Sequence, residues 1–291
     1  MKVLVLGGDG MLGHQVVRQL SSVYDVVATV RKPAAASTAN ALAGSRIISG
    51  IDVRSPDAVS SLLLAEKPQI VINAVGIVKQ RPAAADPLES IEVNSLFPHH
   101  LAKACRIADA RLIHISTDCV FSGEKGGYTE ADNPDPVDLY GRSKLLGEVS
   151  GPGCITIRTS MIGLELANNS SLVEWFLRQH GDVHGYTRSI WSGLTTAELA
   201  RVIHHLIERH RDLDGVWHVS GQPISKYTLL ADFAALLGRP STVVPDDSVV
   251  IDRSLNSERF RAAVAYDAPA WGQMLRELAT AVLDRENRAV V

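Results

Sequence analysis

The regular alternation of apolar and helical segments over the first 160 residues constrains the fold more than any other feature of the chain. Continuously apolar segments predict strands, and segments with helical periodicity lie between them. Strands that are apolar at every position are typical of a parallel sheet covered by helices on both faces. The pattern therefore predicts an α/β fold with a Rossmann-type, doubly wound parallel sheet. The expected strands are residues 2–6, 25–30, 47–51, 69–73, 110–115 and 154–158, and the expected helices are residues 11–22, 33–44, 55–66, 86–108 and 137–149.

The chain after residue 160 follows a looser pattern. We expect helices at residues 172–180, 196–211, 226–237 and 270–286, and a strand at residues 215–219. This less regular order predicts a smaller α+β unit. We therefore expect an NAD(P)-binding domain at residues 1–160 and a mainly substrate-binding domain at residues 161–291, with some segments returning to the first domain.

Composition narrows the class of protein. The chain has 291 residues and a net charge of −3, without the basic excess that is usual in a nucleic-acid binder. Its N-terminus does not have the pattern of a signal peptide, and its apolar runs are too short to span a bilayer. Three cysteines without CxxC spacing favour neither a disulfide scaffold nor a metal site. We expect a cytoplasmic protein with no metal and no nucleic-acid or membrane partner.

A glycine-rich loop follows the first expected strand. Its sequence is GGDGMLG at residues 7–13, and it leads into the first expected helix. Glycines let the backbone approach a pyrophosphate closely, and the helix N-terminus offers free N–H groups. The loop therefore predicts a dinucleotide site that includes Gly7, Gly10, Met11, Leu12 and Gly13.

The second expected strand ends in two cations, Arg31 and Lys32. An acidic residue here would bind the ribose 2′-hydroxyl of NAD, whereas an arginine suits a 2′-phosphate. The pair predicts NADPH (NADP) as cofactor, with NAD less favoured; a solvated basic turn is the alternative. We expect further cofactor contacts from the ends of later strands, at Asp52, Val53, Asn73, Ala74, Val75, Gly76 and Ser116. A helix-capping role is the alternative for Asp52.

Tyr140 and Lys144 give the strongest chemical signal. They are four residues apart on an expected helix and therefore share one face. A nearby cation lowers the pKa of a phenol, which would make Tyr140 a usable proton donor near neutral pH. Thr117, at the end of the fifth expected strand, could polarise a carbonyl beside it. We predict that Thr117, Tyr140 and Lys144 catalyse nicotinamide-dependent carbonyl reduction, with Tyr140 and Lys144 also contacting the cofactor.

These motifs resemble those of the extended short-chain dehydrogenase/reductases, and among them the dTDP-4-dehydrorhamnose reductase group. The resemblance rests on GGDGMLG at 7–13, NAVG at 73–76, ISTDCVFSG at 115–123, DLYGRSK at 138–144 and IRTSMIG at 157–163. It is thinner beyond residue 163, where GLTTAELA at 193–200 and GVWHVSG at 215–221 are similar. It implies a Rossmann domain with a smaller C-terminal substrate domain. It also implies that an NADPH-dependent oxidoreductase reduces the 4-keto group of a nucleotide-linked 6-deoxy sugar, with the proton coming from Tyr140.

The resemblance also suggests where the sugar binds. It places Met161 where residues cover the nicotinamide or the sugar, although this group usually has tryptophan there and an aromatic residue at Cys119. We expect Asp118 to orient substrate hydroxyls or to assist the proton relay, or alternatively to cap the strand end. The complete set of expected substrate-binding residues is Asp118, Val120, Phe121, Met161 and Trp191.

Two other functions remain as alternatives. One is a redox-neutral nucleotide-sugar epimerase that holds NAD tightly, against which Arg31 and Lys32 argue. The other is a non-catalytic regulatory subunit of the same fold. The expected helices at residues 86–108 and 137–149 are those that this superfamily often pairs in a homodimer.

Overall fold

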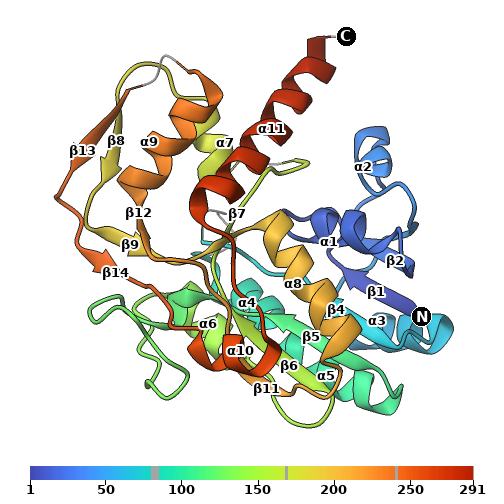
Figure 1. Cartoon of the computed structure of the whole chain (residues 1–291). Helices are drawn as coiled ribbons and strands as arrows, with labels where there is room; N and C mark the ends of the chain where they lie inside the picture. Colours follow the sequence, from blue (N-terminus) through green and yellow to red (C-terminus); the bar gives the residue numbers. More distant parts are fainter. Residues whose placement is uncertain (80–84, 168–169, 240–241, 291) are drawn as a thin grey trace.

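A seven-stranded sheet forms the centre of the computed structural model, which describes residues 1–79, 85–167, 170–239 and 242–290 (Figure 1). Its strand order is β11-β6-β5-β4-β1-β2-β3, and every neighbouring pair is parallel. The order reverses between β1 and β4, as in a doubly wound sheet. The predicted α/β class is therefore confirmed. The strands are β1 (Lys2–Leu6), β2 (Asp25–Val30), β3 (Arg46–Ser49), β4 (Ile70–Asn73), β5 (Arg111–Ile115), β6 (Cys154–Arg158) and β11 (Gly215–His218).

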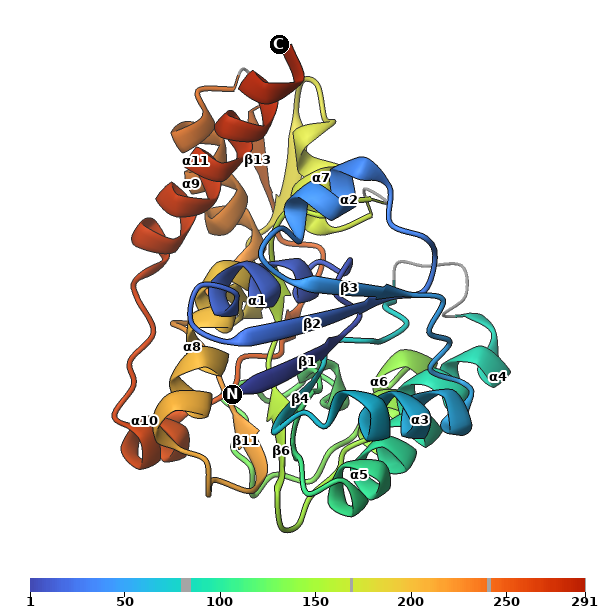
Figure 2. The same ribbon diagram turned by 90° about the vertical axis from the view of Figure 1, so that its right-hand side faces the viewer.

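Helices cover both faces of this sheet (Figure 2). On one face α1 (Gly13–Leu20) packs against α8 (Thr196–Arg209), and on the other α3 (Pro56–Glu66) packs against α5 (Phe97–Ile107). Alternate residues of β1 join opposite cores, because successive strand side chains point to opposite faces. A strand covered on both sides must be apolar throughout, which explains the sequence pattern. A short helix, α2 (Ala36–Ala41), connects β2 to β3.

The long helix expected at residues 86–108 is interrupted. The structure has α4 (Pro87–Ser90), then a π-helical segment η2 (Ile91–Leu96), then α5. Pro98 has no N–H to donate to the Asn94 carbonyl, so a regular α-helical bond is lost at that point. A Cβ on Gly147 would overlap the same carbonyl, so the following chain packs tightly against the irregular turn.

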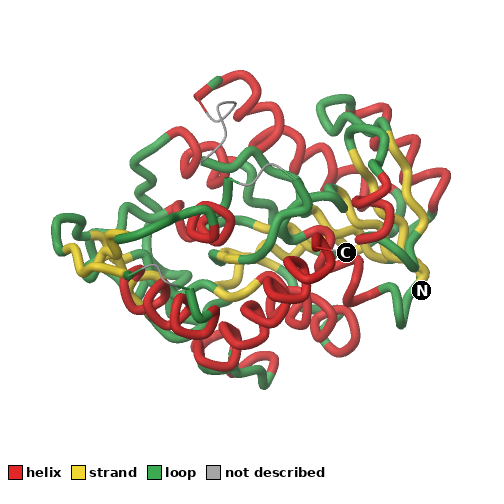
Figure 3. The backbone as a smooth tube through the Cα atoms, turned by 90° about the horizontal axis from the view of Figure 1, so that it is seen from above, coloured by secondary structure: helices red, strands yellow, loops and turns green. Residues whose placement is uncertain are grey.

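The chain after residue 160 contributes strand β11 to the central sheet and helix α8 to one of its faces. Most of its other segments form three small sheets and four helices among the described residues. Figures 1 and 3 place β8, β9, β13 and β14 at the end of the molecule away from the N-terminus. Two of the small sheets have two strands each: β7 (Met161–Ile162) pairs with β10 (Leu194–Thr195), and β8 (Val183–Tyr186) pairs with β13 (Val243–Asp246). The third has three strands, in which β9 (Ser189–Trp191) lies between β12 (Ile224–Ser225) and β14 (Ile251–Asp252). The helices here are α7 (Leu172–Leu177), α9 (Lys226–Leu237), α10 (Glu258–Val264) and α11 (Trp271–Val290).

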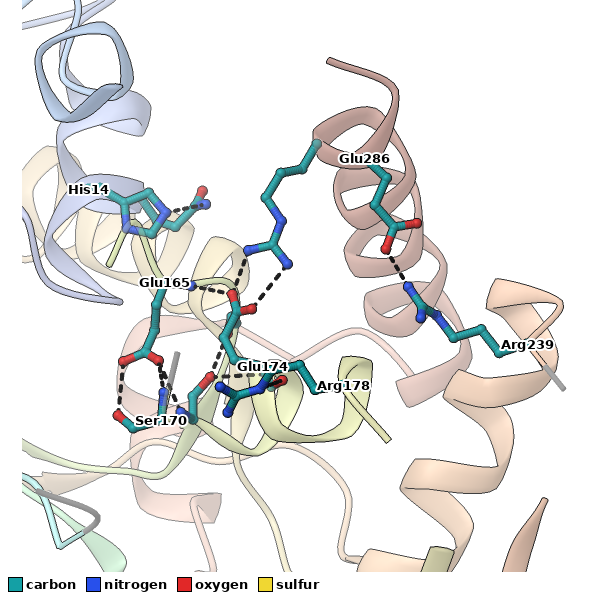
Figure 4. A network of polar contacts seen from close by, with 11 residues as sticks. His14, Glu165, Ser170, Glu174, Arg178, Arg239 and Glu286 are labelled. Carbon is teal, nitrogen blue, oxygen red and sulfur yellow. Dashed lines mark hydrogen bonds and ion pairs between the residues drawn. The ribbon is translucent and has the colours of Figure 1, made fainter. Parts of the chain in front are cut away.

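The buried carboxylate of Glu174 connects three segments of this second part (Figure 4). Glu174 on α7 accepts hydrogen bonds of 2.6 and 3.1 Å from the Arg285 guanidinium on α11, and one of 3.0 Å from the backbone N–H of Glu165. The Glu165 carboxylate in turn accepts the backbone N–H groups of Ser170 and Ser171. The loop after β7 is therefore held to α7 and α11. No helix of the described residues is long and apolar enough to cross a membrane.

Candidate active site

The glycine loop lies at the switch point of the sheet, between β1 and α1. Gly7 has a φ of +77°, and a Cβ on Gly13 would overlap the Gly7 carbonyl, so the helix begins directly against the loop. The Gly10 N–H donates to the Gly7 carbonyl at 3.0 Å. Met11 is half-buried, and Leu12 is buried just before α1. This backbone cradle fits a pyrophosphate group at the N-terminus of α1.

Exposed charges lie at the ends of β2 and β3. Arg31 and Lys32 are exposed, and the Arg31 charge acts on Asp52. Asp52 binds Arg54 through contacts of 2.6 to 3.1 Å, and this hydrogen-bonded cation lowers the pKa of Asp52 to about 2. The capping alternative for Asp52 is wrong, because Ser55 caps α3. Arg54, which we did not predict, adds a third cation to this region.

The segment after β4 leads from the glycine loop toward the catalytic candidates. Asn73 is fully buried; its amide contacts His114 at 3.0 Å and accepts the Val75 N–H at 3.1 Å. A Cβ on Gly7 would lie 3.0 Å from Val75, and one on Gly76 would lie 4.0 Å from Lys144 Nζ. Val53, Ala74 and Val75 are half-buried, and Gly76 is exposed. The glycine loop therefore contacts the segment after β4, and that segment reaches Lys144.

Tyr140 and Lys144 lie on α6 (Leu139–Leu146), which Asp138 caps by accepting the Gly141 N–H at 2.8 Å. Lys144 is buried and donates to the Ile115 carbonyl at 2.6 Å. Burial lowers the pKa of Lys144 to about 8, although the negative charge of Glu148 acts in the opposite direction. Tyr140 is half-buried, and Thr117 hydrogen-bonds its phenol. The structure therefore brings the three predicted catalytic residues together.

The expected net lowering of the Tyr140 pKa is wrong for this structure. Burial raises the pKa of Tyr140, the charges of Cys119 and Asp118 add to the rise, and the Thr117 hydrogen bond opposes it. Lys144 is itself desolvated, and its ammonium donates to the Ile115 carbonyl. Tyr140 is consequently protonated at neutral pH, which is the form that donates a proton.

Thr117 connects the phenol to Asp118. Its hydroxyl donates to the Asp118 carboxylate at 3.2 Å and accepts the Cys119 N–H at 3.1 Å, capping the short 3-10 turn η3 (Asp118–Val120). Burial raises the pKa of Asp118, and the positive charges of Lys226 and Arg253 oppose this rise. Burial also raises the pKa of the Cys119 thiol to about 12. Thr117 therefore combines a capping role with a place in the candidate site.

The other expected substrate residues have different environments. Val120 and Phe121 are fully buried, and Phe121 stacks on Tyr128 with the ring centroids 4.2 Å apart. Their side chains belong to a small buried apolar cluster with Tyr128 and Leu255, and they therefore support the site from behind. Met161 on β7 is half-buried, and Trp191 on β9 is buried beneath Lys226.

A buried ion pair lies behind the catalytic residues and was not predicted. Glu148 accepts hydrogen bonds from Arg158 at 2.8 and 2.7 Å, and its carboxylate also accepts the Ser116 hydroxyl at 2.7 Å. Both members of the pair have less than a tenth of their side-chain surface exposed. Because Ser116 precedes Thr117, this pair fixes the end of β5. Ser116 is 3% exposed and contributes to that anchor.

Three more residues complete the site from outside the predicted motifs. Asn94 in η2 bonds both backbone groups of Ile77 and the Ser143 hydroxyl. Lys226, at the start of α9, and Arg253, after β14, lie near Asp118; Arg253 donates to the Phe121 carbonyl at 2.9 Å. No motif around these residues indicated a role in the site, because they approach the end of β5 only when the chain is folded.

A family model described as the RmlD substrate binding domain matches residues 1–282. The chain belongs to this family. A curated relative, the dTDP-4-dehydrorhamnose reductase of Streptomyces griseus, is 27% identical over 316 residues, covering 99% of this chain and 96% of that protein. The resemblance stated from the motifs is therefore confirmed.

Solved structures share the fold. The dTDP-4-dehydrorhamnose reductase of Bacillus anthracis, in complex with NADP, superposes with a TM-score of 0.79 at 21% identity, covering 95% of this chain and 98% of that one. The UDP-glucose 4-epimerase of Thermotoga maritima, with UDP-glucose, has a TM-score of 0.82 at 15% identity, covering 98% and 99%. Reductases and epimerases thus have this same architecture, and the fold alone does not separate them.

Proposed function

We propose that this protein is an oxidoreductase that uses NADPH to reduce the 4-keto group of a nucleotide-linked 6-deoxy sugar. The observation that carries the proposal is the joint placement of Thr117, Tyr140 and Lys144 at the end of the sheet, in a chain of the RmlD family. The full-length similarity to a dTDP-4-dehydrorhamnose reductase supports the substrate class.

The described residues fit NADPH. The cradle of Gly7, Gly10 and Gly13 accepts a pyrophosphate, since side chains there would fill it or overlap backbone. Exposed Arg31 and Lys32 are placed for a 2′-phosphate, with Arg54 and Asp52 beside them. The path from Asn73 to Gly76 leads to Lys144. The bound cofactor supplies hydride to the substrate carbon.

Side chains of the protein itself supply the proton and stabilise the charge that its transfer creates. Tyr140 donates its phenolic proton to the oxygen that becomes the alcohol, and burial keeps that proton in place until the oxygen gains charge. On substrate binding the Thr117 hydroxyl turns from Asp118 and donates its hydrogen bond to the same oxygen, which it orients toward Tyr140. Lys144 provides positive charge that stabilises the phenolate formed by the transfer. Glu148 helps Lys144 to remain protonated in its buried position.

We also propose how the chain is organised. Residues 1–160 hold the cofactor and residues 161–291 hold most of the sugar nucleotide, with β11 returning to the first part. A homodimer through α4, η2 and α6 is supported by exposed apolar side chains on these elements, at Leu88, Ile91, Leu96 and Leu146. Three free cysteines fit a reducing, cytoplasmic location. Light scattering of the wild type and a Leu96→Glu, Leu146→Glu double variant would test the dimer.

The deciding experiment follows NADPH absorbance with a panel of nucleotide-linked 4-keto-6-deoxy sugars, with NADH in parallel. We expect oxidation of NADPH with at least one sugar and slower oxidation of NADH. NAD that co-purifies at full occupancy, with interconversion of sugar epimers, would instead establish the epimerase. Binding of NADPH without turnover of any sugar would favour the regulatory subunit.

A further inference from the structure

Lys226 is brought to the candidate site by strand pairing in the second part of the chain. It is the first residue of α9 and directly follows β12, which pairs antiparallel with β9 so that Ile224 lies opposite Trp191. This register places the Lys226 ammonium 3.7 Å from the centroid of the Trp191 ring. The ring holds the cation in place by a cation–π contact.

The ammonium has unused hydrogen-bonding capacity. It carries three N–H donors, yet within the ranges that the structure describes it makes no hydrogen bond. Burial lowers the pKa of Lys226 to about 8, and Asp118 opposes this shift. The indole N–H of Trp191 is buried and likewise lacks a partner among the described residues. The buried indole N–H is unfavourable without an acceptor, and the half-buried Lys226 ammonium beside it has donors to offer, so the pair is suited to binding a polar ligand.

Asp118 provides an acceptor beside this donor. The charges of Lys226 and Asp118 act on each other, and Asp118 accepts the Thr117 hydroxyl at 3.2 Å. Thr117 also hydrogen-bonds the Tyr140 phenol. The Lys226 ammonium and the Asp118 carboxylate therefore act on each other electrostatically without forming an ion pair among the described residues, so a polar ligand can lie between them.

We propose that Lys226 and Asp118 form a subsite for two neighbouring hydroxyl groups of the substrate sugar, and that Lys226 determines specificity for them. This inference rests on the proposed function and adds a residue and a role to it. One hydroxyl accepts a hydrogen bond from Lys226, and its neighbour donates one to Asp118. A vicinal diol satisfies both groups, because each hydroxyl can donate and accept.

A sugar diol fits this subsite better than the diphosphate of the same substrate does. A phosphate next to the Asp118 carboxylate would suffer like-charge repulsion in a site of low dielectric constant. Arg253, the other cation at Asp118, already donates to the Phe121 carbonyl and contacts the Cys119 sulfur at 3.9 Å. The unengaged donors of Lys226 therefore lie within the electrostatic influence of a carboxylate that disfavours a second anion.

Binding measurements can separate the sugar from the diphosphate. Calorimetry would compare the wild type with Lys226→Met, using UDP- and dTDP-linked 6-deoxyhexoses and the free nucleoside diphosphates UDP and dTDP. We expect Lys226→Met to weaken the sugar nucleotide about 10- to 100-fold, as for loss of a charge-assisted hydrogen bond, and to change the diphosphate less than about 2-fold. Lys125→Met is the matched control, since Lys125 also lies over an aromatic ring but on the exposed surface.

Several outcomes would overturn the inference. Equal weakening of sugar nucleotide and diphosphate would assign Lys226 to the phosphates, and unchanged affinity for both would remove it from the site. A sugar nucleotide that lacks the 2- and 3-hydroxyls should bind the wild type and Lys226→Met with similar affinity. If Lys226→Met weakens this analogue as much as the complete sugar nucleotide, the contact between Lys226 and the diol is contradicted. Failure of the proposed function is distinguishable, because the wild type would then bind sugar nucleotide without oxidising NADPH.

Discussion

Charged residues at the two ends of the proposed cofactor path have opposite surroundings. At the adenosine end, Arg31, Lys32 and Arg54 are exposed, and water and salt screen them. At the catalytic end, Lys144, Glu148 and Asp118 are buried, and each perturbs or is perturbed by its neighbours. We therefore expect the exposed charges to recognise the cofactor with modest energy, and the buried charges to control proton transfer and stability.

The largest effect should come from the catalytic end. Tyr140→Phe removes the proton donor but keeps the ring that fills the site, so we expect turnover to fall about 10²- to 10⁴-fold. NADPH affinity, measured by fluorescence titration, should remain nearly unchanged. Turnover close to that of the wild type would exclude Tyr140 as the donor.

The buried ion pair should dominate stability. Glu148→Leu leaves Arg158 charged and unpaired in the interior, and we expect a loss of about 3–5 kcal/mol in the free energy of unfolding. Arg209→Ala breaks an exposed pair with Glu208 and should cost about 1 kcal/mol or less. Urea denaturation of both variants would measure the contrast, and equal losses would contradict it.

Cofactor preference should respond to the adenosine end. Arg31→Glu places an anion where the 2′-phosphate is expected, and we predict that NADPH binding weakens about 10-fold or more while NADH binding changes much less. Dissociation constants for both cofactors would test this, with Arg209→Ala as a control for a surface arginine. Equal weakening of the two cofactors would show that Arg31 does not contact the 2′-phosphate.

A smaller effect is expected in the pH dependence. The pKa of Lys144 is lowered to about 8, so its stabilising charge is present below that pH and is lost above it. Turnover should therefore decline as the pH rises through about 8. Glu148→Gln removes the negative charge that favours protonated Lys144, so the decline should begin at lower pH. A kcat–pH profile that does not move would show that Glu148 leaves Lys144 unaffected.

The sequence predicted the large sheet because its signals are local. β2 and α9 have the predicted bounds, and α3 differs from its predicted range only in that Ser55 caps it rather than starting it. The short strands β7, β10, β12 and β14 have two residues each and were missed, since they depend on partners distant in the chain. A two-residue strand has no periodicity to detect.

In the candidate site, too, residues close together in the sequence were predicted, whereas contacts between residues far apart in the sequence were not. Spacing placed Tyr140 and Lys144 on one helix, but it did not reveal how strongly the fold desolvates them, so the direction of the Tyr140 pKa shift was wrong. Lys226 and Arg253 reach Asp118 from more than a hundred residues away. Their role depends on tertiary packing, for which the sequence offered no motif.

The position of β11 at the edge of the sheet has a consequence for how the chain folds during synthesis. β6 pairs with β11, which the ribosome makes after β7 to β10 and α8. Until then β6 is an apolar edge strand with unpaired backbone groups in the growing chain. Ribosome-bound chains that stop before residue 215 should therefore be sensitive to proteases and dependent on chaperones, and protection should appear once residues 215–218 have left the exit tunnel.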